Sequence, residues 1–375
     1  MRDPTTRAPE AERLAWLRLY RSENVGPATF FRLLEHFGTA TRAIDALPDL
    51  ARRGGGKRPV KVAPVSIAER EFESLAKLGG QLILATDPGF PATLRAVETV
   101  PFLTVRGRAE LLTRHSVAVV GARNASAAGR RFAQTIAADL GKADLVVVSG
   151  MARGIDSAAH EGALSTGTIA VLAGGVDVVY PPENAKLYER IIESGCAVSE
   201  MPPGTEPQAS HFPRRNRLIS GIALGTVVVE ASARSGSLIT ARLALEQGRE
   251  IFAVPGSPLD PRSEGPNGLI KQGATLTESA ADVLAGLADI LRRPRSKPGL
   301  GEGGGSPRAP ALPPENAMAE ARQKVAEALG PTAVPVDEII RQCHVSPAIV
   351  SMVLLEMELA GRLERHPGGQ VSTVF

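Results

Sequence analysis

The sequence predicts an α/β protein whose largest part is an extended, doubly wound, mainly parallel β-sheet. Short β-branched runs recur between residues 117 and 254 and begin roughly 24–30 residues apart. Helix-like stretches separate these runs, and the runs are apolar on both faces, which is typical of βαβ units in a sheet covered on both sides. With 375 residues, the chain also has room for a small helical domain before the sheet and a winged-helix-like domain after it.

The composition is that of an ordinary globular protein. Hydrophobic residues make up 43% of the chain and the formal net charge is +3, which is too small to indicate a nucleic-acid partner by itself. Cys196 and Cys343 have neither metal-ligand spacing nor the pattern of a disulfide framework. We find no apolar core of a signal peptide and no run near the roughly 18 apolar residues of a membrane span. We therefore expect a soluble cytoplasmic protein without a membrane partner.

Residues 1–60 predict a small helical domain. Apolar residues at helical spacing lie on both sides of a break at Asn24–Pro27, so we expect two short helices around a Gly-Pro turn. Such a pair resembles a helix-hairpin-helix or sterile-alpha-motif-like (SAM-like) unit. The turn has one glycine rather than a Gly-x-Gly pair, so packing or a protein contact is favoured over DNA binding. The stretch Arg52–Pro59, with three consecutive glycines, predicts a flexible break.

Residues 61–292 predict the sheet domain. A helix near Ser66–Leu78 precedes the first strands, and the regular alternation that follows is that of a Rossmann-like doubly wound domain. The expected strands are Leu82–Ala85, Phe102–Val105, Val117–Val120, Leu145–Val148, Ile169–Leu172, Ala197–Val198, Val227–Val229 and Ile251–Val254.

The last part of the chain predicts a linker and a winged-helix-like domain. Residues 293–315 are mostly Pro, Gly, Ser and Arg, the composition of a flexible linker. Residues 316–375 then suggest three helices and a two-strand wing. The third helix carries Glu356 and Glu358 and no cation, so it would be repelled by DNA phosphates. Arg362 and Arg365 in the wing keep some DNA contact possible, but we expect this domain to contact protein.

The loops that follow the strands are the candidate binding site, because ligands of doubly wound sheets bind at the carboxyl ends of the strands. Glycines there let backbone amides approach a ligand, and helix N-termini favour anions. Arg123, Arg153 and Arg234 add cations to three of these loops, which favours a phosphate pocket over purely structural turns. The candidate positions are Gly121, Arg123 and Asn124, then Ser149, Gly150, Arg153 and Gly154, then Ser235, Gly236 and Ser237.

Two common phosphate ligands do not fit these loops. No stretch matches Gly-x4-Gly-Lys-Ser/Thr, and Gly121 stands alone, with Arg123 where the dinucleotide pattern needs its second glycine. ATP and NAD are therefore disfavoured, we predict no cofactor, and the phosphates of mononucleotides or polynucleotides remain.

A cationic cluster lies in the stretch HFPRRNRLISG at 211–221. Guanidinium groups fit phosphate oxygens, and the aromatic Phe212 can stack on a base. Of the three arginines, Arg214 and Arg217 are the expected DNA contacts and Arg215 is less certain, since some of them can be structural. A solvated helix face is the alternative.

Asp156 and His160 share one helix face, as metal ligands sometimes do. No third ligand stands at a suitable spacing, and a carboxylate at a helix N-terminus is favoured electrostatically. Ser149 and Ser237 do not lie in a Gly-x-Ser-x-Gly elbow. We predict no metal and no catalytic residue.

The chain resembles the DNA-processing protein A (DprA/Smf) family. The resemblance rests on motifs that follow one another in order through most of residues 82–280. They are VAVVGARN at 117–124, SGMARGIDSAAHEGAL at 149–164, TIAVLAGGVDVVYPPEN at 168–184, SEMPPG at 199–204, HFPRRNRLISG at 211–221, VVVEASARSGSLITA at 227–241 and FAVPGS at 252–257. Ala122 departs from the family's frequent serine, which removes one side-chain donor.

The resemblance implies a non-enzymatic, single-stranded DNA-binding recombination mediator. Members of the family protect incoming DNA during natural transformation, load the recombinase RecA onto it and act as homodimers through the Rossmann-like domain. Carried over by motif, the phosphate pocket comprises Gly121, Arg123, Ser149, Gly150, Arg153, Ser235, Gly236 and Ser237. Arg214, Arg215 and Arg217 extend its basic track, with Phe212 as a base-stacking candidate.

The competing hypothesis is a phosphoribohydrolase-like enzyme that processes nucleotide phosphates in the same pocket. Glu200 and Glu230 end strands, where one is a general-base candidate, although a carboxylate bonded to neighbouring amides is at least as well supported. The Pro-Gly-Gly-x-Gly-Thr signature of such enzymes is missing, and residues 233–237 read Ala-Arg-Ser-Gly-Ser in its place.

Overall fold

The computed structural model describes residues 8–97, 100–292, 315–366 and 368–374. These residues form two compact units. The central unit holds the described residues from Glu71 to Arg292, and the terminal unit combines Ala8–Arg70 with the described residues after 314. The division at residue 60 stays a prediction, and the predicted linker, 293–315, lies outside the described residues except for its last position.

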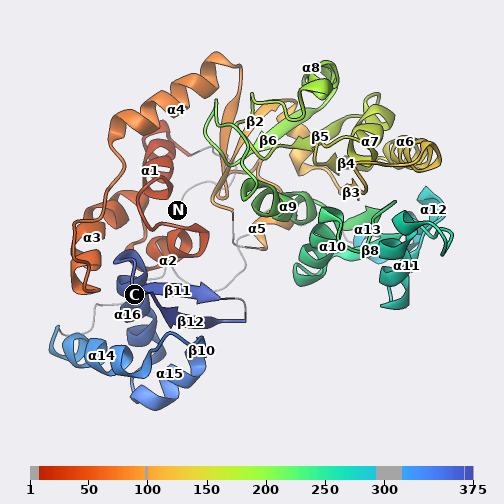
Figure 1. The fold of residues 1–375 in the computed structure, drawn as a ribbon. Helices are drawn as coiled ribbons and strands as arrows, with labels where there is room; N and C mark the ends of the chain where they lie inside the picture. The colour runs from red at the N-terminus through yellow and green to blue at the C-terminus, as the bar shows by residue number, and fades with distance from the viewer. Residues whose placement is uncertain (1–7, 98–99, 293–314, 367, 375) are drawn as a thin grey trace. The chain divides into compact units, whose positions relative to one another are not determined.

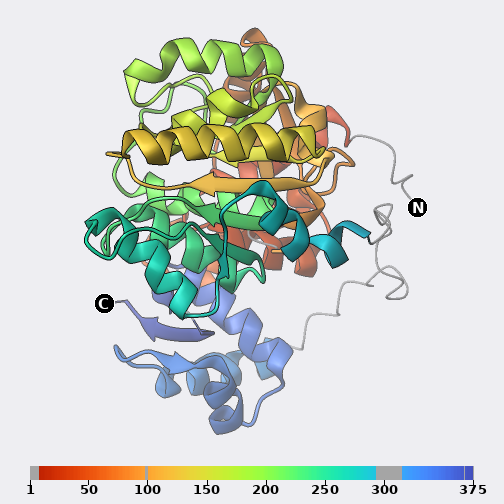
Figure 2. The ribbon, with the colours of Figure 1, turned by 90° about the vertical axis from the view of Figure 1, so that its right-hand side faces the viewer.

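The central unit contains the expected mainly parallel sheet (Figures 1 and 2). Its nine strands are arranged in the order β1-β2-β6-β5-β4-β3-β7-β8-β9, and every pairing from β6 to β9 is parallel. β2 pairs antiparallel with β1 and with β6. All eight predicted strands are confirmed, whereas the two-residue β9 was not foreseen because it has no apolar run. The strands are β1 (Gln81–Leu84), β2 (Phe102–Gly107), β3 (Ser116–Val120), β4 (Val146–Ser149), β5 (Thr168–Val171), β6 (Cys196–Ser199), β7 (Gly225–Val228), β8 (Glu250–Ala253) and β9 (Thr275–Leu276).

The strand order decides which helices cover which face. Right-handed crossovers run outward from β3 to β6, then return to the other side of β3 for β7, so the helices divide between the two faces. α6, α7, α8 and α12 cover one face, and α9, α10 and α11 cover the other. The helices of this unit are α5 (Ala92–Arg95), α6 (Ala127–Lys142), α7 (Ile155–Ala163), α8 (Ala185–Ser194), α9 (His211–Ile222), α10 (Gly236–Glu246), α11 (Glu264–Lys271), α12 (Ala280–Gly286) and α13 (Ala288–Arg292), with short 3-10 turns at Ala109–Thr113, Pro182–Asn184 and Pro261–Ser263.

One hydrophobic core of the central unit lies between the sheet and α6, α7 and α12. Val117 and Val119 of β3 pack there against Ile136 and Leu140 of α6, and all four side chains are almost completely buried. Because β3, β4, β5 and β6 are buried along their whole length, they read in the sequence as continuous apolar runs.

The N-terminal part of the terminal unit has one helix more than we expected. α1 (Glu10–Tyr20), α2 (Pro27–Phe37) and α3 (Ala40–Arg53) enclose Phe30, whose ring is fully buried with its centroid 5.0 Å from that of Trp16. α3 was not separated in the sequence because Pro48 lies inside it, where proline disfavours a helix. A fourth helix, α4 (Val65–Lys77), leads toward the central unit.

The segment Arg52–Pro59, whose glycines predict a flexible break, begins inside α3 and continues as a hydrogen-bonded turn. α3 continues to Arg53, Gly55 takes a φ of 83°, and the amide of Gly56 donates to the carbonyl of Ala51 at 2.9 Å. Three glycines lower the intrinsic order of a segment, but they also permit close packing and positive φ. Here the packing prevails.

The C-terminal part of the terminal unit has the predicted three helices and wing. β11 and β12 form the wing, and β12 also pairs with β10, which was not foreseen. The elements are α14 (Glu315–Ala328), β10 (Val334–Pro335), α15 (Val336–Cys343), α16 (Pro347–Leu359), β11 (Leu363–His366) and β12 (Gln370–Thr373).

No single helix of the described residues is long and apolar enough to cross a membrane. α15 and α16 reach the required length and hydropathy only as a pair, and a bend of 118° separates them.

Candidate phosphate-binding site at the carboxyl edge of the sheet

A cavity of the central unit lies at the carboxyl end of β3. From β3 the chain runs to β4 on one side, whereas from β7 it runs to β8 on the other, so β3 and β7 border the point where the strand order reverses. Ligands of doubly wound sheets bind at such a switch point, where loops and helix N-termini converge. This central pocket has a volume of about 460 Å³ and is lined by the loops after β3 and β7 and by α9. Its lining includes the predicted residues Gly121, Arg123, Asn124, Phe212, Arg215, Ser235, Gly236 and Ser237.

Two of the predicted glycines are explained by packing between loops. A Cβ on Gly121 would lie 2.6 Å from the side chain of Ile155, and one on Gly154 would lie 2.3 Å from the carbonyl oxygen of Ala122. Gly154 also has a φ of 81°, which favours glycine. These glycines let the loops after β3 and β4 approach each other closely, so they position the pocket's wall.

The N-termini of two helices are held at this edge of the sheet. Ser126 caps α6, and its backbone N–H and hydroxyl donate to the Glu230 carboxylate at 2.8 and 2.5 Å. Glu230 is therefore a strand-end carboxylate bonded to a helix start, the arrangement that the sequence supported at least as well as a general base. Ser235 caps α10 and lies 2.7 Å, oxygen to oxygen, from Ser237. The space beside Gly236 is open, which leaves the first turn of α10 accessible to an anion.

Arg123 is the exposed cation of the pocket. Its guanidinium carbon lies 5.4 Å from the centroid of the Phe212 ring, and that of Arg215 lies 5.9 Å from it. The edge of Tyr180 meets the same ring at 5.6 Å between centroids, and Tyr180 is 49% exposed. The sequence predicted no role for Tyr180, because its neighbours in the chain do not indicate that it lies beside Phe212. The result is a partly exposed aromatic pair bordered by cations.

Arg215 is an internal cation. It is 7% exposed, and its Nη1 donates to the carbonyl oxygens of Gly150 and of Val171, the latter at 2.5 Å. Burial lowers the pKa of Arg215 to about 10, against the charge of Asp156 nearby, so the guanidinium stays protonated at neutral pH. Burial also raises the pKa of Asp156. The two charges attract each other between α7 and α9, so Arg215 belongs to the frame of the pocket.

Arg217 and Arg214 of α9 differ in exposure and in their partners. Arg217 makes an ion pair with Glu200 at 2.5 Å, with exposed side-chain fractions of 16% and 11%, so it is tied to the loop after β6. Arg214, by contrast, is exposed, and no ion pair or hydrogen bond of its side chain occurs within the part of the chain that the structure describes. We had expected both to contact DNA, and Arg214 is the better placed of the two.

The loop after β4 contributes less than its sequence suggested. Ser149 is fully buried and donates its hydroxyl to the carbonyl of Val119 at 2.7 Å, so this hydroxyl is used inside the sheet. Gly150 lies against Arg215, where a Cβ would be 2.5 Å from Nη1.

Arg153 and Arg234 are exposed but do not line the pocket. Arg262, which does line it, is held by Asp260 at 2.8 Å, and no motif pointed to it.

The Asp156 and His160 pair is structural, and the described residues contain no group of three potential metal ligands. The His160 ring is fully buried, and its Nδ1 lies 2.8 Å from the Thr168 hydroxyl. The Thr168 hydroxyl donates its proton to the carbonyl of Val147, so it must accept from His160, and Nδ1 of that ring carries a proton. Burial lowers the pKa of His160 to about 3, which keeps the ring neutral.

A family model described as DNA recombination-mediator protein A matches residues 81–288. The chain belongs to this family. A second model, described as a DprA-like N-terminal HHH domain, matches residues 10–74, and a third, described as a DprA winged helix domain, matches residues 307–369. The predicted family, the helix-hairpin-helix domain and the winged-helix domain are thereby confirmed.

Relatives and solved structures agree with this assignment to the DNA recombination-mediator protein A family. The chain is 40% identical to Protein Smf of Escherichia coli over 294 residues, which cover 77% of this chain and 76% of that protein. The crystal structure of DNA processing protein A from Streptococcus pneumoniae matches with a TM-score of 0.64 and 34% identity, over 75% of this chain and 98% of that one. A structure that concerns the single-stranded DNA binding mode of the Helicobacter pylori protein matches with a TM-score of 0.50 and 29% identity, over 54% and 94%.

Proposed function

We propose that this protein binds single-stranded DNA in the central pocket and mediates recombination. The carrying observation is that Arg123, the open N-terminus of α10 and the Phe212–Tyr180 pair lie together at the switch point of a recombination-mediator fold. Cations and helix amides suit backbone phosphates, and exposed aromatic faces suit the unstacked bases of a single strand. The related Helicobacter pylori protein, whose structure concerns single-stranded DNA binding, supports the same ligand.

We divide the predicted site residues into those that can contact DNA and those that hold the scaffold. Arg123, Asn124 and Gly236 line the pocket, with Arg214, Arg153 and Arg234 as exposed cations outside its lining. Ser149, Arg215 and Arg217 hold the scaffold through internal hydrogen bonds and an ion pair. Ser235 caps α10 and is hydrogen-bonded to Ser237, and Gly121, Gly150 and Gly154 allow close packing.

Three further parts of the proposal rest on the family resemblance. The protein protects incoming DNA and loads RecA during natural transformation, it acts as a homodimer through the central unit, and it works in the cytoplasm. Catalysis is not part of this proposal, because Glu230 is bonded to the start of α6. Incubating the protein with a panel of nucleotides would contradict this point if base or phosphate were released and Glu230→Gln abolished the release.

The binding proposal is tested with fluorescence anisotropy of a labelled single-stranded oligonucleotide. The double variant Arg123→Ala/Arg214→Ala should weaken binding at least tenfold, because two exposed cations are lost. A matched control, Arg131→Ala/Arg190→Ala, removes two exposed cations of α6 and α8 that do not line the pocket and should bind within about twofold of wild type. Equal affinity of the first double variant and the control would contradict the proposal.

A further inference from the structure

The acidic third helix of the winged domain is neutralised within its own chain. Glu356 is 1% exposed and accepts two hydrogen bonds from Arg322 of α14, at 2.7 and 3.0 Å. Glu358 accepts from the Thr29 hydroxyl of α2 at 2.7 Å and from Arg365 of the wing at 2.8 Å. We had predicted a protein contact for this helix. Within the terminal unit, Glu358 contacts Thr29 of the N-terminal helices, and a contact with another protein stays a prediction.

The glycine turn after α3 fits closely against α16. A Cβ on Gly54 would lie 2.0 Å from the carbonyl oxygen of Glu356, so only glycine permits this approach. Asn24 of the Gly-Pro turn donates to the carbonyl of Leu359 at 2.9 Å. The turns of residues 24–27 and 54–59 are therefore fixed on the C-terminal end of α16.

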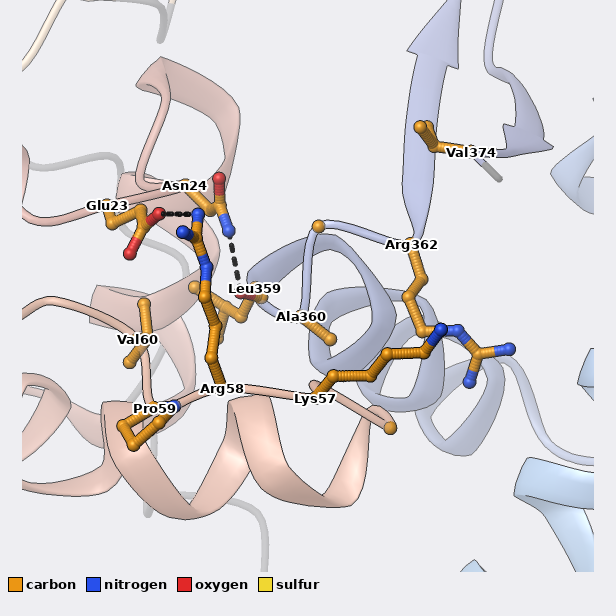
Figure 3. A pocket seen from close by; sticks show the side chains of 12 residues that line it. Glu23, Asn24, Lys57, Arg58, Pro59, Val60, Leu359, Ala360, Arg362 and Val374 are labelled. Carbon is orange, nitrogen blue, oxygen red and sulfur yellow. Dashed lines mark hydrogen bonds and ion pairs between the residues drawn. The ribbon is translucent and has the colours of Figure 1, made fainter.

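A pocket of about 830 Å³ lies where these segments meet, and we call it the terminal pocket (Figure 3). Its cations are Lys57, Arg58 and Arg362, and its carboxylate is Glu23. Apolar side chains complete the wall, from Pro59, Val60, Leu359, Ala360 and Val374.

The charges of the terminal pocket do not balance. Glu23 binds Arg58 at 2.7 Å and also accepts from the amide of Lys61 at 3.0 Å, so each of its carboxylate oxygens already has a partner. Figure 3 shows the Lys57 side chain directed toward that of Arg362. Neither makes an ion pair with any carboxylate of the described residues. Two like charges thus face one cavity, and no carboxylate of the described residues is paired with either of them, which favours an anion there.

Arg362 is held in position by the turn. Its Nη1 lies 3.4 Å from the carbonyl oxygen of Gly54, and a Cβ on Gly55 would lie 2.3 Å from the same nitrogen. The glycine therefore leaves room for the guanidinium, whose remaining donors are available to a ligand.

We propose that the terminal pocket is a second binding site for the backbone phosphates of single-stranded DNA, an inference that rests on the proposed function. A guanidinium and an ammonium group supply the phosphate contacts, and the apolar wall can cover a sugar or a base. The same cations would also accept the phosphates of free nucleotides or pyrophosphate, so the test separates these sources.

The direct test is lysine acetylation of the wild-type full-length protein, read by mass spectrometry. A saturating single-stranded oligonucleotide should slow acetylation of Lys57 at least fivefold, while Lys186, which is exposed on α8, changes less than twofold. Protection of Lys57 should persist in Arg123→Ala/Arg214→Ala at oligonucleotide concentrations that still bind. Unchanged Lys57 reactivity while the wild type binds DNA would overturn the second site and leave the proposed function intact. Protection by pyrophosphate but not by the oligonucleotide would overturn its assignment to DNA.

A charge-reversal pair provides an independent measurement. Lys57→Glu/Arg362→Glu should lower affinity for a long oligonucleotide at least fivefold and reduce the slope of log affinity against log salt by roughly 1.4, from two lost phosphate contacts. The control Arg42→Glu/Lys324→Glu makes the same change in net charge at two exposed positions of the terminal unit that do not line the pocket. Equal loss in both double variants would show a general charge effect and overturn the site. If the first pair lowers the unfolding temperature, Lys57→Ala alone replaces it, with an expected slope change of roughly 0.7.

Discussion

The central and terminal pockets both contain three arginine or lysine side chains, but the fold treats their charges differently. In the central pocket, Arg215 faces Asp156 and Arg262 is paired with Asp260, which leaves Arg123 as the exposed cation. In the terminal pocket, one carboxylate meets three cations and is used by Arg58. The number of cations around a cavity therefore does not give the charge that a ligand meets. The carboxylates and carbonyls that the fold brings to each cation decide that charge.

The largest expected effect is on protein stability, and it distinguishes the buried Arg215 from the exposed Arg123 of the central pocket. Arg215→Met should lower the free energy of unfolding by about 3–5 kcal/mol, because it leaves the buried Asp156 without its cation. Arg123→Met, at an exposed position, should change it by less than about 0.5 kcal/mol. Urea denaturation monitored by circular dichroism measures both. The double variant Arg215→Met/Asp156→Asn should recover part of the loss, and equal stability of the two single variants would refute the division.

A smaller effect concerns the pH dependence of stability beneath the central pocket. His160 has a folded-state pKa of about 3, below its ordinary value near 6.5, so the unfolded chain takes up a proton that the folded chain refuses. The neutral ring therefore costs no stability well above pH 6.5. As the pH falls toward 3, the free energy of unfolding decreases, and the loss is about 2 kcal/mol at pH 5. His160→Gln should therefore show a flatter stability profile between pH 7 and 5 than wild type. Parallel profiles would contradict the buried, neutral ring.

The smallest predicted effect sharpens the role of the aromatic pair. Tyr180→Ala should weaken binding of a single-stranded oligonucleotide by about 1 kcal/mol, roughly fivefold, through loss of base stacking. The salt dependence should stay unchanged, because no charge is removed. Leu259→Ala is a suitable control, since Leu259 is 93% exposed in the same unit and does not line the pocket. A change in the salt slope, or an equal loss in the control, would count against stacking.

The sequence predicted the sheet and the edge that carries the central pocket because both follow from local patterns. Strands buried on both faces appear as short apolar runs, and the loops after them carry Gly121, Arg123 and Gly236 in a fixed order. Parallel strands bring such loops to one edge. Arg123 was therefore found without any knowledge of the contacts it makes.

The division of the arginines in α9 could not be predicted in the same way. Arg214, Arg215 and Arg217 are near neighbours in the chain, but a helix turns them to different sides. Their partners, Gly150, Val171 and Glu200, come from three other loops or strands, so only the assembled fold reveals them.

The terminal pocket was also beyond the sequence. Lys57 and Arg362 come from opposite ends of the chain, and the glycines between Arg53 and Lys57 suggested a flexible segment. Their place against α16 depends on tertiary packing, which no local periodicity encodes. Glu356 and Glu358 of α16 led us to predict a protein contact, but the sequence could not indicate their partners within the chain, Arg322, Thr29 and Arg365.

The most direct test of the central claim compares the salt dependence of DNA affinity for two variants of the central pocket. Arg123→Ala should reduce the slope of log affinity against log salt by roughly 0.7, the value for one lost phosphate contact on a single strand. Glu200→Gln/Arg217→Gln removes the internal ion pair without leaving a buried charge and should keep the wild-type slope. A wild-type slope in Arg123→Ala, or a loss of similar size in the Glu200 and Arg217 variant, would contradict the account.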